Sequence, residues 1–178
     1  MRRVLIIGNS GGGKSTLARR LGVALNIPVI HLDVLFWKPG WIEPDRTEFR
    51  ADVDSAMAGE AWICDGNFGG TWDLRMPRAD TIVWVDQPPL LCLARAIRRV
   101  FAYRREARPD MAEGCREKLD PKFYAYILGF NRKVRPRLEA AIAEHGTQAR
   151  LVRLRSDREI DAFVSGAGHQ GSVKSRGT

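Results

Sequence analysis

Residues 8–15 combine glycines, a lysine and a serine at the spacing of a phosphate-binding loop. They read GNSGGGKS and fit the pattern GxxxxGK(S/T) in full. Glycines let the backbone curl so that successive N–H groups point at phosphate oxygens, and a helix beginning near Lys14 adds its positive dipole end. In such loops the lysine reaches the β- and γ-phosphates and the serine hydroxyl ligates Mg²⁺. The sequence therefore predicts a site for ATP and Mg²⁺ at Gly8, Ser10, Gly11, Gly12, Gly13, Lys14 and Ser15.

The elements that position this loop alternate between strand-like and helix-like patterns, which predicts an α/β domain with a mainly parallel sheet. Short apolar runs predict strands at residues 3–7, 28–32, 61–64, 81–85 and 149–154. Apolar stripes at helical spacing predict helices at residues 14–25, 44–58, 89–105, 121–144 (kinked near Gly129 and Pro136) and 157–164. Ligands of such sheets bind beyond the carboxyl ends of the strands, so the residues directly after each strand are candidates for a site.

Length and composition fit one domain. The chain has 178 residues and a formal net charge of +8. We expect a domain over residues 1–164, with a lid region at about 99–120, and a disordered Gly/Ser-rich tail over residues 165–178. The apolar stretches are far shorter than the roughly 20 residues of a membrane span, and no signal peptide is visible. Three scattered cysteines without CxxC spacing favour a reducing cytoplasm.

Two aspartates at strand ends are candidate metal ligands. Asp86 follows an apolar strand, as a Walker B aspartate does, although it could instead cap the helix after Pro88. Gln87 stands where ATPases that drive machines commonly carry a glutamate, which favours transfer to a bound acceptor over simple hydrolysis. Asp33 follows the second strand and could ligate Mg²⁺, take a proton from an acceptor, or serve only as a turn residue.

Other residues near strand ends could bind the acceptor. Trp37 lies in an aromatic-rich loop (34–41), which could form the floor of a ring pocket or clamp the next helix onto the sheet. Asp65 and Asn67 lie among glycines after the third strand, where they could bond an acceptor or simply form a turn. Arg75 follows and could hold an acceptor phosphate. We interpret His31 as a core residue.

An arginine cluster follows the fourth strand. Six arginines lie within fourteen residues, at positions 95, 98, 99, 104, 105 and 108. A basic helix followed by a loop is where a lid would bring arginines onto transferring phosphates, although such a cluster can also be a solvated basic face. The excess of positive charge suits an anionic partner, either a nucleotide or a nucleic acid.

The chain resembles the DNA topology modulation proteins, within the adenylate-kinase-like branch of P-loop kinases. The resemblance rests on IIGNSGGGKSTLARRL, HLDVLFWKPGW, WICDGNFGGTWDLRMPRADTIVWVD and ARPDMAEGC, over about residues 3–140. It implies a three-layer P-loop fold with a five-stranded parallel sheet of order 2-3-1-4-5. It also implies a nucleotide site reaching Thr16, Asp33 as a catalytic or metal-side carboxylate, and Arg99, Arg104 and Arg105 as catalytic lid arginines. Adenylate kinases carry GxPR where this chain has DGNF, a departure that argues against AMP as the acceptor.

Two functions follow as hypotheses. The first is an ATP- and Mg²⁺-dependent kinase of a nucleotide or other small molecule, acting as a monomer or a dimer. The second is an ATP-regulated nucleic-acid-binding protein that influences DNA topology, which the charge supports but for which no helix-turn-helix, zinc-finger or RNA-recognition pattern is present.

Overall fold

The five predicted strands form a single parallel sheet. The computed structural model describes residues 1–103 and 110–173. Its strands are β1 (Arg3–Gly8), β2 (Val29–His31), β3 (Trp62–Asp65), β4 (Thr81–Val85) and β5 (Arg150–Leu154). Their order is β2-β3-β1-β4-β5, and every neighbouring pair is parallel, which confirms the expected topology.

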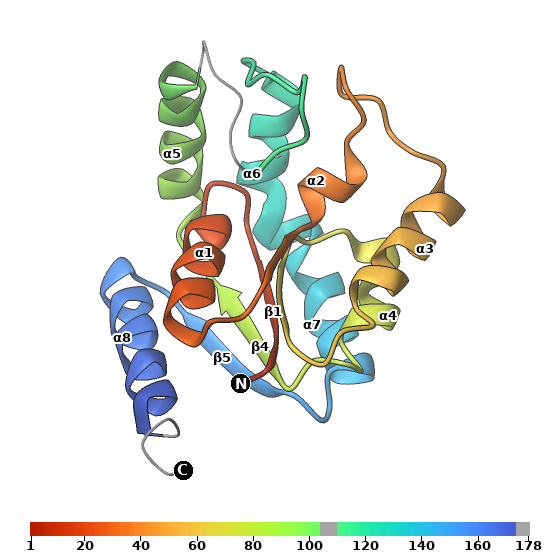
Figure 1. Ribbon diagram of the computed structural model, residues 1–178. Helices are drawn as coiled ribbons and strands as arrows, with labels where there is room; N and C mark the ends of the chain where they lie inside the picture. Colours follow the sequence, from red (N-terminus) through yellow and green to blue (C-terminus); the bar gives the residue numbers. More distant parts are fainter. Residues whose placement is uncertain (104–109, 174–178) are drawn as a thin grey trace.

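Helices cover both faces of the sheet. They are α1 (Lys14–Leu25), α2 (Leu32–Phe36), α3 (Arg46–Ala56), α4 (Trp72–Arg75), α5 (Pro89–Ala102), α6 (Pro121–Lys133), α7 (Arg135–His145) and α8 (Asp157–Val173), with a 3₁₀ turn, η1 (Gly69–Thr71). Figure 1 shows α1 and α8 on one side of the sheet and α3, α4 and α7 on the other. None of the helices in the described part of the chain is long and apolar enough to cross a membrane.

Alternating residues of β1 build two separate cores, as the period of two in a strand requires. Val4 and Ile6 pack with Leu17 and Leu21 of α1, whereas Leu5 and Ile7 lie in the cluster of α3, α4 and α7. Because both faces are buried, β1, β3 and β4 carry almost continuous apolar runs. The result is the three-layer arrangement expected from the sequence.

The helix predicted over residues 121–144 is two helices. They join at Val134, and Pro136 lies in the first turn of α7, where a missing N–H costs nothing. Gly129 lies inside α6 without breaking it.

The prediction of a disordered tail from residue 165 is wrong as far as residue 173, because α8 continues to Val173. Ala167 is buried in the core shared with α1. A Cβ on Gly168 would lie 4.0 Å from the Cβ of Ala24, so the small residues that suggested a tail permit close packing of the two helices. Residues 174–178 lie outside the described part.

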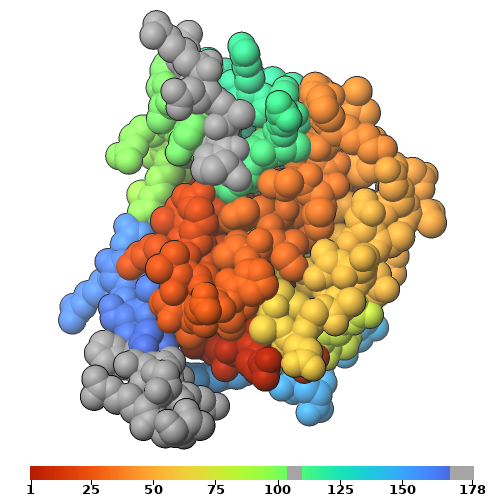
Figure 2. Space-filling view, viewed as in Figure 1, coloured from red at the N-terminus to blue at the C-terminus, as the bar shows by residue number. Residues whose placement is uncertain are grey.

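The predicted lid region is described only in part. Helix α5 ends at Ala102, and residues 104–109 lie outside the described residues. Residues 110–120 pack against the loop after α2, where the Sγ of Cys115 contacts the carbonyl of Lys38 at 3.4 Å and Gly114 lies against Pro39. Figure 2 shows the teal segment beside the orange segment on the surface of the molecule.

Candidate active site

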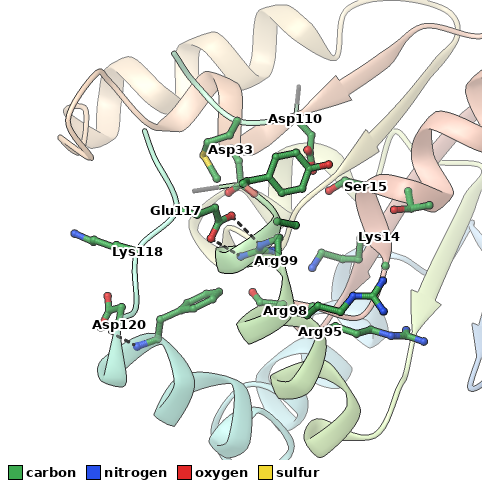
Figure 3. A pocket seen from close by; sticks show the side chains of 18 of the residues that line it. Lys14, Ser15, Asp33, Arg95, Arg98, Arg99, Asp110, Glu117, Lys118 and Asp120 are labelled. Atoms are coloured by element: carbon green, nitrogen blue, oxygen red, sulfur yellow. Dashed lines mark hydrogen bonds and ion pairs between the residues drawn. The ribbon is translucent and has the colours of Figure 1, made fainter. Parts of the chain in front are cut away.

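A cavity of about 950 Å³ lies at the carboxyl edge of the sheet. The phosphate loop, the segment after β2, helix α5 and residues 110–123 surround it (Figure 3). Its volume is near the upper end of the roughly 300–1,000 Å³ typical of ligand sites, so it has room for two small ligands side by side. A smaller hollow of about 310 Å³, lined by Arg2, Arg3, Glu60 and Asp80, contains none of the predicted site residues.

The phosphate loop lines this cavity with six of its predicted residues: Ser10, Gly11, Gly13, Lys14, Ser15 and Thr16. Gly8 and Gly12 are buried beneath it. Gly11 has φ +80°, and a Cβ there would lie 2.2 Å from the carbonyl oxygen of Cys92, so only glycine fits. Among the residues that the structure describes, no side chain caps the first turn of α1, so its N–H groups are open to a ligand or to water.

Lys14 lies at the centre of the site. Its Nζ donates to the carbonyl oxygen of Asn9 at 3.0 Å, a contact that a phosphate oxygen can replace. Burial lowers the pKa of Lys14 below its ordinary value, and the charges of Asp65 and Asp33 oppose this shift only in part. The carboxylates thus favour the charged form of a lysine that the fold partly removes from water.

Asp33 is in the first turn of α2 and lines the same cavity as Ser15. The short helix was not expected from the sequence, but it places the carboxylate on the side of the phosphate loop (Figure 3). A hydroxyl and a carboxylate are the oxygen donors that Mg²⁺ takes in phosphate sites, where water and phosphate supply the other ligands. The donor set therefore fits this ion. Within the described residues, no cluster of three or more His, Cys, Asp or Glu forms an all-protein metal site.

Three arginines of α5 line the cavity: Arg95, Arg98 and Arg99. Arg95 pairs with Asp157 at 2.5 Å, and Arg99 pairs with Glu117 at 2.8 Å. These contacts hold guanidinium groups at the cavity rather than spreading them over a solvated face. The predicted catalytic residues Arg104 and Arg105 lie outside the described part of the chain.

Asp65, Asn67 and Arg75 do not line the cavity, in contrast to the prediction that they bind the acceptor. Asp65 is buried, and its carboxylate lies 2.5 Å from Nδ1 of His31; burial lowers the pKa of His31, but the bond and charge of Asp65 outweigh it and raise the pKa. Arg75 is fully buried, so it cannot reach an acceptor phosphate. It donates to the carbonyl oxygens of Gly66, Asn67 and Phe68 instead.

Asp86 also lies outside the residues that line the cavity. Its carboxylate pairs with Arg135 and, at 2.9 Å, with Arg153. Both guanidinium groups lie over the ring of Trp84, at 5.4 and 4.6 Å from its centroid. The strand-end position resembled a metal ligand in sequence, but in the fold the group joins β4 to β5 and α7.

The aromatic loop after β2 packs one ring against α3 and turns two others to the cavity, and the binding of a ligand ring there stays a prediction. Phe36 packs against Phe49 and Phe68 and clamps α3 to the sheet. Trp37 and Trp41 meet edge to face at 5.2 Å and line the cavity.

Sequence reasoning missed several lining residues, among them Arg19, Lys118 and Phe123. Arg19 lies one helical turn after Ser15, a spacing that could have identified it. Lys118 lies 5.7 Å from the ring centroid of Trp41, a contact that no local pattern indicates.

Comparisons with known proteins support the fold. No protein-family model matches the chain, and neither does any curated protein. Among solved structures, the chain is similar to shikimate kinase from Bacteroides thetaiotaomicron, at 20% identity and a TM-score of 0.54 over 95% of this chain and 97% of that one. It is also similar to shikimate kinase from Acinetobacter baumannii in complex with shikimate, at 14% identity and a TM-score of 0.55 over 100% and 96%. At these identities the likeness establishes a P-loop kinase fold; the narrower resemblance to DNA topology modulation proteins stays a prediction.

Proposed function

We propose that the protein is a P-loop kinase that transfers the γ-phosphoryl group of ATP to a hydroxyl or phosphate group of a small molecule. The observation that carries the proposal is that Lys14 and Ser15 of the phosphate loop share one cavity with Asp33. Lys14 and Ser15 begin the helix that follows β1, and Asp33 lies in the helix that follows β2. All three side chains therefore come from segments at the carboxyl ends of parallel strands. A cavity of about 950 Å³ has room for a nucleotide tail and an acceptor together.

In this proposal each side chain has a distinct role. Lys14 binds the β- and γ-phosphates, and Arg98 and Arg99 neutralise charge on the group in transfer. Ser15 and Asp33 would hold Mg²⁺, which supplies charge neutralisation at the phosphates. Asp33 also orients the acceptor: the acceptor oxygen bonds to the γ-phosphorus, the bond to the bridging oxygen breaks and ADP leaves. When the acceptor is a hydroxyl, its proton passes to the carboxylate.

The arginines of α5 favour a kinase over the nucleic-acid-binding hypothesis. Arg95, Arg98 and Arg99 line the cavity, where Arg95 pairs with Asp157 and Arg99 pairs with Glu117. A nucleic-acid surface needs basic side chains spread along a groove or a helix face. We also propose, from the sequence motifs, that the chain belongs with the DNA topology modulation proteins within the P-loop kinases.

The test is a screen for ATP- and Mg²⁺-dependent phosphorylation of nucleosides, nucleoside monophosphates, polyols and shikimate. For any acceptor found, Lys14→Ala should reduce kcat/KM by at least about 100-fold, the effect of removing one preorganised charge donor. Lys133→Ala removes an exposed lysine of α6 outside the cavity and should leave the rate unchanged. Equal activity of the two variants would refute the assignment of the site.

A further inference from the structure

The end of β1 carries an unusual pairing of main chain and side chain. β1 and β3 pair up to Ile6 and Asp65, and the N–H of Gly66 donates to the carbonyl oxygen of Ile6 at 3.2 Å. β1 continues to Gly8, past the last residue of β3. There the Asn67 side chain takes the place of the next main-chain group: its Oδ1 accepts from the N–H of Gly8 at 3.0 Å, and its Nδ2 donates to the carbonyl oxygen of Gly8 at 2.8 Å.

This double contact needs an amide of this length. A primary amide offers one acceptor and a pair of donors on a planar group, as a peptide does. Gly8 is buried, so its N–H and C=O must find partners within the protein. An aspartate could accept from the N–H but could not donate to the carbonyl, and a leucine of similar shape could do neither.

Asn67 is itself held firmly. Arg75 donates to the main-chain carbonyl of Asn67 at 2.6 Å and to that of Gly66 at 3.1 Å. A link to α6 adds to this, since Asn67 Nδ2 lies 3.4 Å from the hydroxyl of Tyr126. The amide is therefore a fixed point against which the end of β1 is placed.

Gly8 is the residue from which the phosphate loop departs. Its φ of +140° sets the direction of the chain over Asn9 and Ser10 toward the loop N–H groups. Phosphate recognition by a loop depends on those N–H groups being aimed before the ligand arrives. Without the two hydrogen bonds from Asn67 to Gly8, the loop would adopt other conformations and its affinity for phosphates would fall.

We propose that Asn67 is a positioning residue of the phosphate loop, which acts through the main chain of Gly8 rather than by touching substrate. The proposal rests on the proposed function only in requiring that this loop binds phosphates. It replaces the role of acceptor ligand expected from the sequence, where a polar residue after a strand suggested a contact with substrate.

The test compares ligand affinity with stability in matched variants of the full chain. Isothermal calorimetry measures the Kd of Mg·ATP and of Mg·triphosphate, and thermal unfolding gives Tm. Asn67→Leu removes both bonds, Asn67→Asp removes the donor, and Tyr126→Phe removes only the weaker contact with the tyrosine hydroxyl. Thr81→Val deletes a 2.7 Å bond to Asp80 at the opposite end of the sheet and serves as a control for stability alone.

Asn67→Leu should raise the Kd of both ligands about tenfold, equivalent to about 1.4 kcal/mol. Asn67→Asp should raise both Kd values as well, Tyr126→Phe should stay within about twofold of wild type, and Thr81→Val should lower Tm without changing either Kd. If Asn67→Leu does not fold, Asn67→Asp supplies the measurement.

Three results would overturn the proposal. Unchanged Kd values in the Asn67 variants would leave Asn67 a purely structural residue. If the Asn67 variants bind Mg·ATP more weakly but Mg·triphosphate unchanged, Asn67 affects binding of the nucleoside part of ATP rather than binding of the phosphates. Wild-type protein that binds neither ligand would refute the proposed function together with this inference. If the variants show the expected Kd changes but no acceptor is phosphorylated, only the proposed kinase activity fails.

Discussion

Replacement of Arg75 by methionine should destabilise the fold strongly, although the sequence suggested a role in binding. The guanidinium group is fully buried and donates to three main-chain carbonyls and, at 3.0 Å, to the Thr71 hydroxyl. Methionine fills a similar volume but donates nothing, so the buried carbonyl of Gly66 loses a partner. At about 1 kcal/mol for each carbonyl bond, the loss is about 3 kcal/mol.

Two further effects change this loss of stability in opposite directions. Burial lowers the pKa of Arg75, which reflects the cost of taking its charge out of water. Methionine avoids that cost, whereas bonds from a charged donor are each stronger than the value used above. A loss of about 3 kcal/mol corresponds to a fall in Tm of about 6–12 °C for a chain of this size.

The assay is thermal unfolding followed by circular dichroism, with Arg78→Met as the matched control. Arg78 belongs to the same segment and pairs with Asp54 at 2.7 Å, but the two side chains are 37% and 53% exposed. A solvent-screened pair of this kind contributes at most about 1 kcal/mol, so the control should lose no more than about 4 °C.

An Arg75→Met variant that unfolds within about 1 °C of the wild-type protein would refute the structural role of this arginine. A variant with unchanged Tm and a raised KM for the acceptor would restore the binding role that the sequence suggested. A large fall in Tm, with the arginine control near wild type, would identify Arg75 as the support of the loop after β3.

Two further predictions concern the phosphate loop and the thiols. Gly11→Ala should abolish Mg·ATP binding in calorimetry, because its Cβ would lie 2.2 Å from the Cys92 carbonyl oxygen. A Cβ at Gly13 meets no atom of the described residues within 4 Å, so Gly13→Ala should cost only left-handed strain of about 1–2 kcal/mol. Equal effects of the two variants on affinity would contradict the geometry. Burial raises the pKa of Cys64 to about 11, so at pH 8 only about one thiol in a thousand is ionised. Ellman's reagent should therefore label Cys64 only after unfolding, and rapid labelling of the native protein, mapped by mass spectrometry, would show that this side chain is accessible.

The elements with strong local patterns could be predicted from the sequence. The bounds of α1 and β4 agree with the predicted ranges, because an apolar stripe and a short β-branched run are properties of neighbouring residues. The phosphate loop belongs to the same class, since its glycines, lysine and serine act through the backbone of a single turn. The short helix α2 after β2 was missed because its five residues are too few for a periodic pattern.

Candidate residues at strand ends required the tertiary structure. Asp33, Asn67 and Asp86 all look alike in sequence, as polar side chains that follow strands. Asp33 lines the cavity, Asn67 bonds to Gly8, and Asp86 meets arginines of β5 and α7. What separates them is which groups lie across from each side chain, and those groups are far away in the sequence.

The sequence by itself determined that the chain could form a parallel α/β sheet with a phosphate-binding loop, because both follow from local spacing and burial. Only the tertiary structure decided which charged groups line the cavity and which are paired with other protein groups away from it. The physical reason is that a buried polar group must be paired, and its partner is selected by packing rather than by sequence distance. Arg75 and Arg99 are both arginines of helices, yet one supports buried carbonyls and the other lines the site.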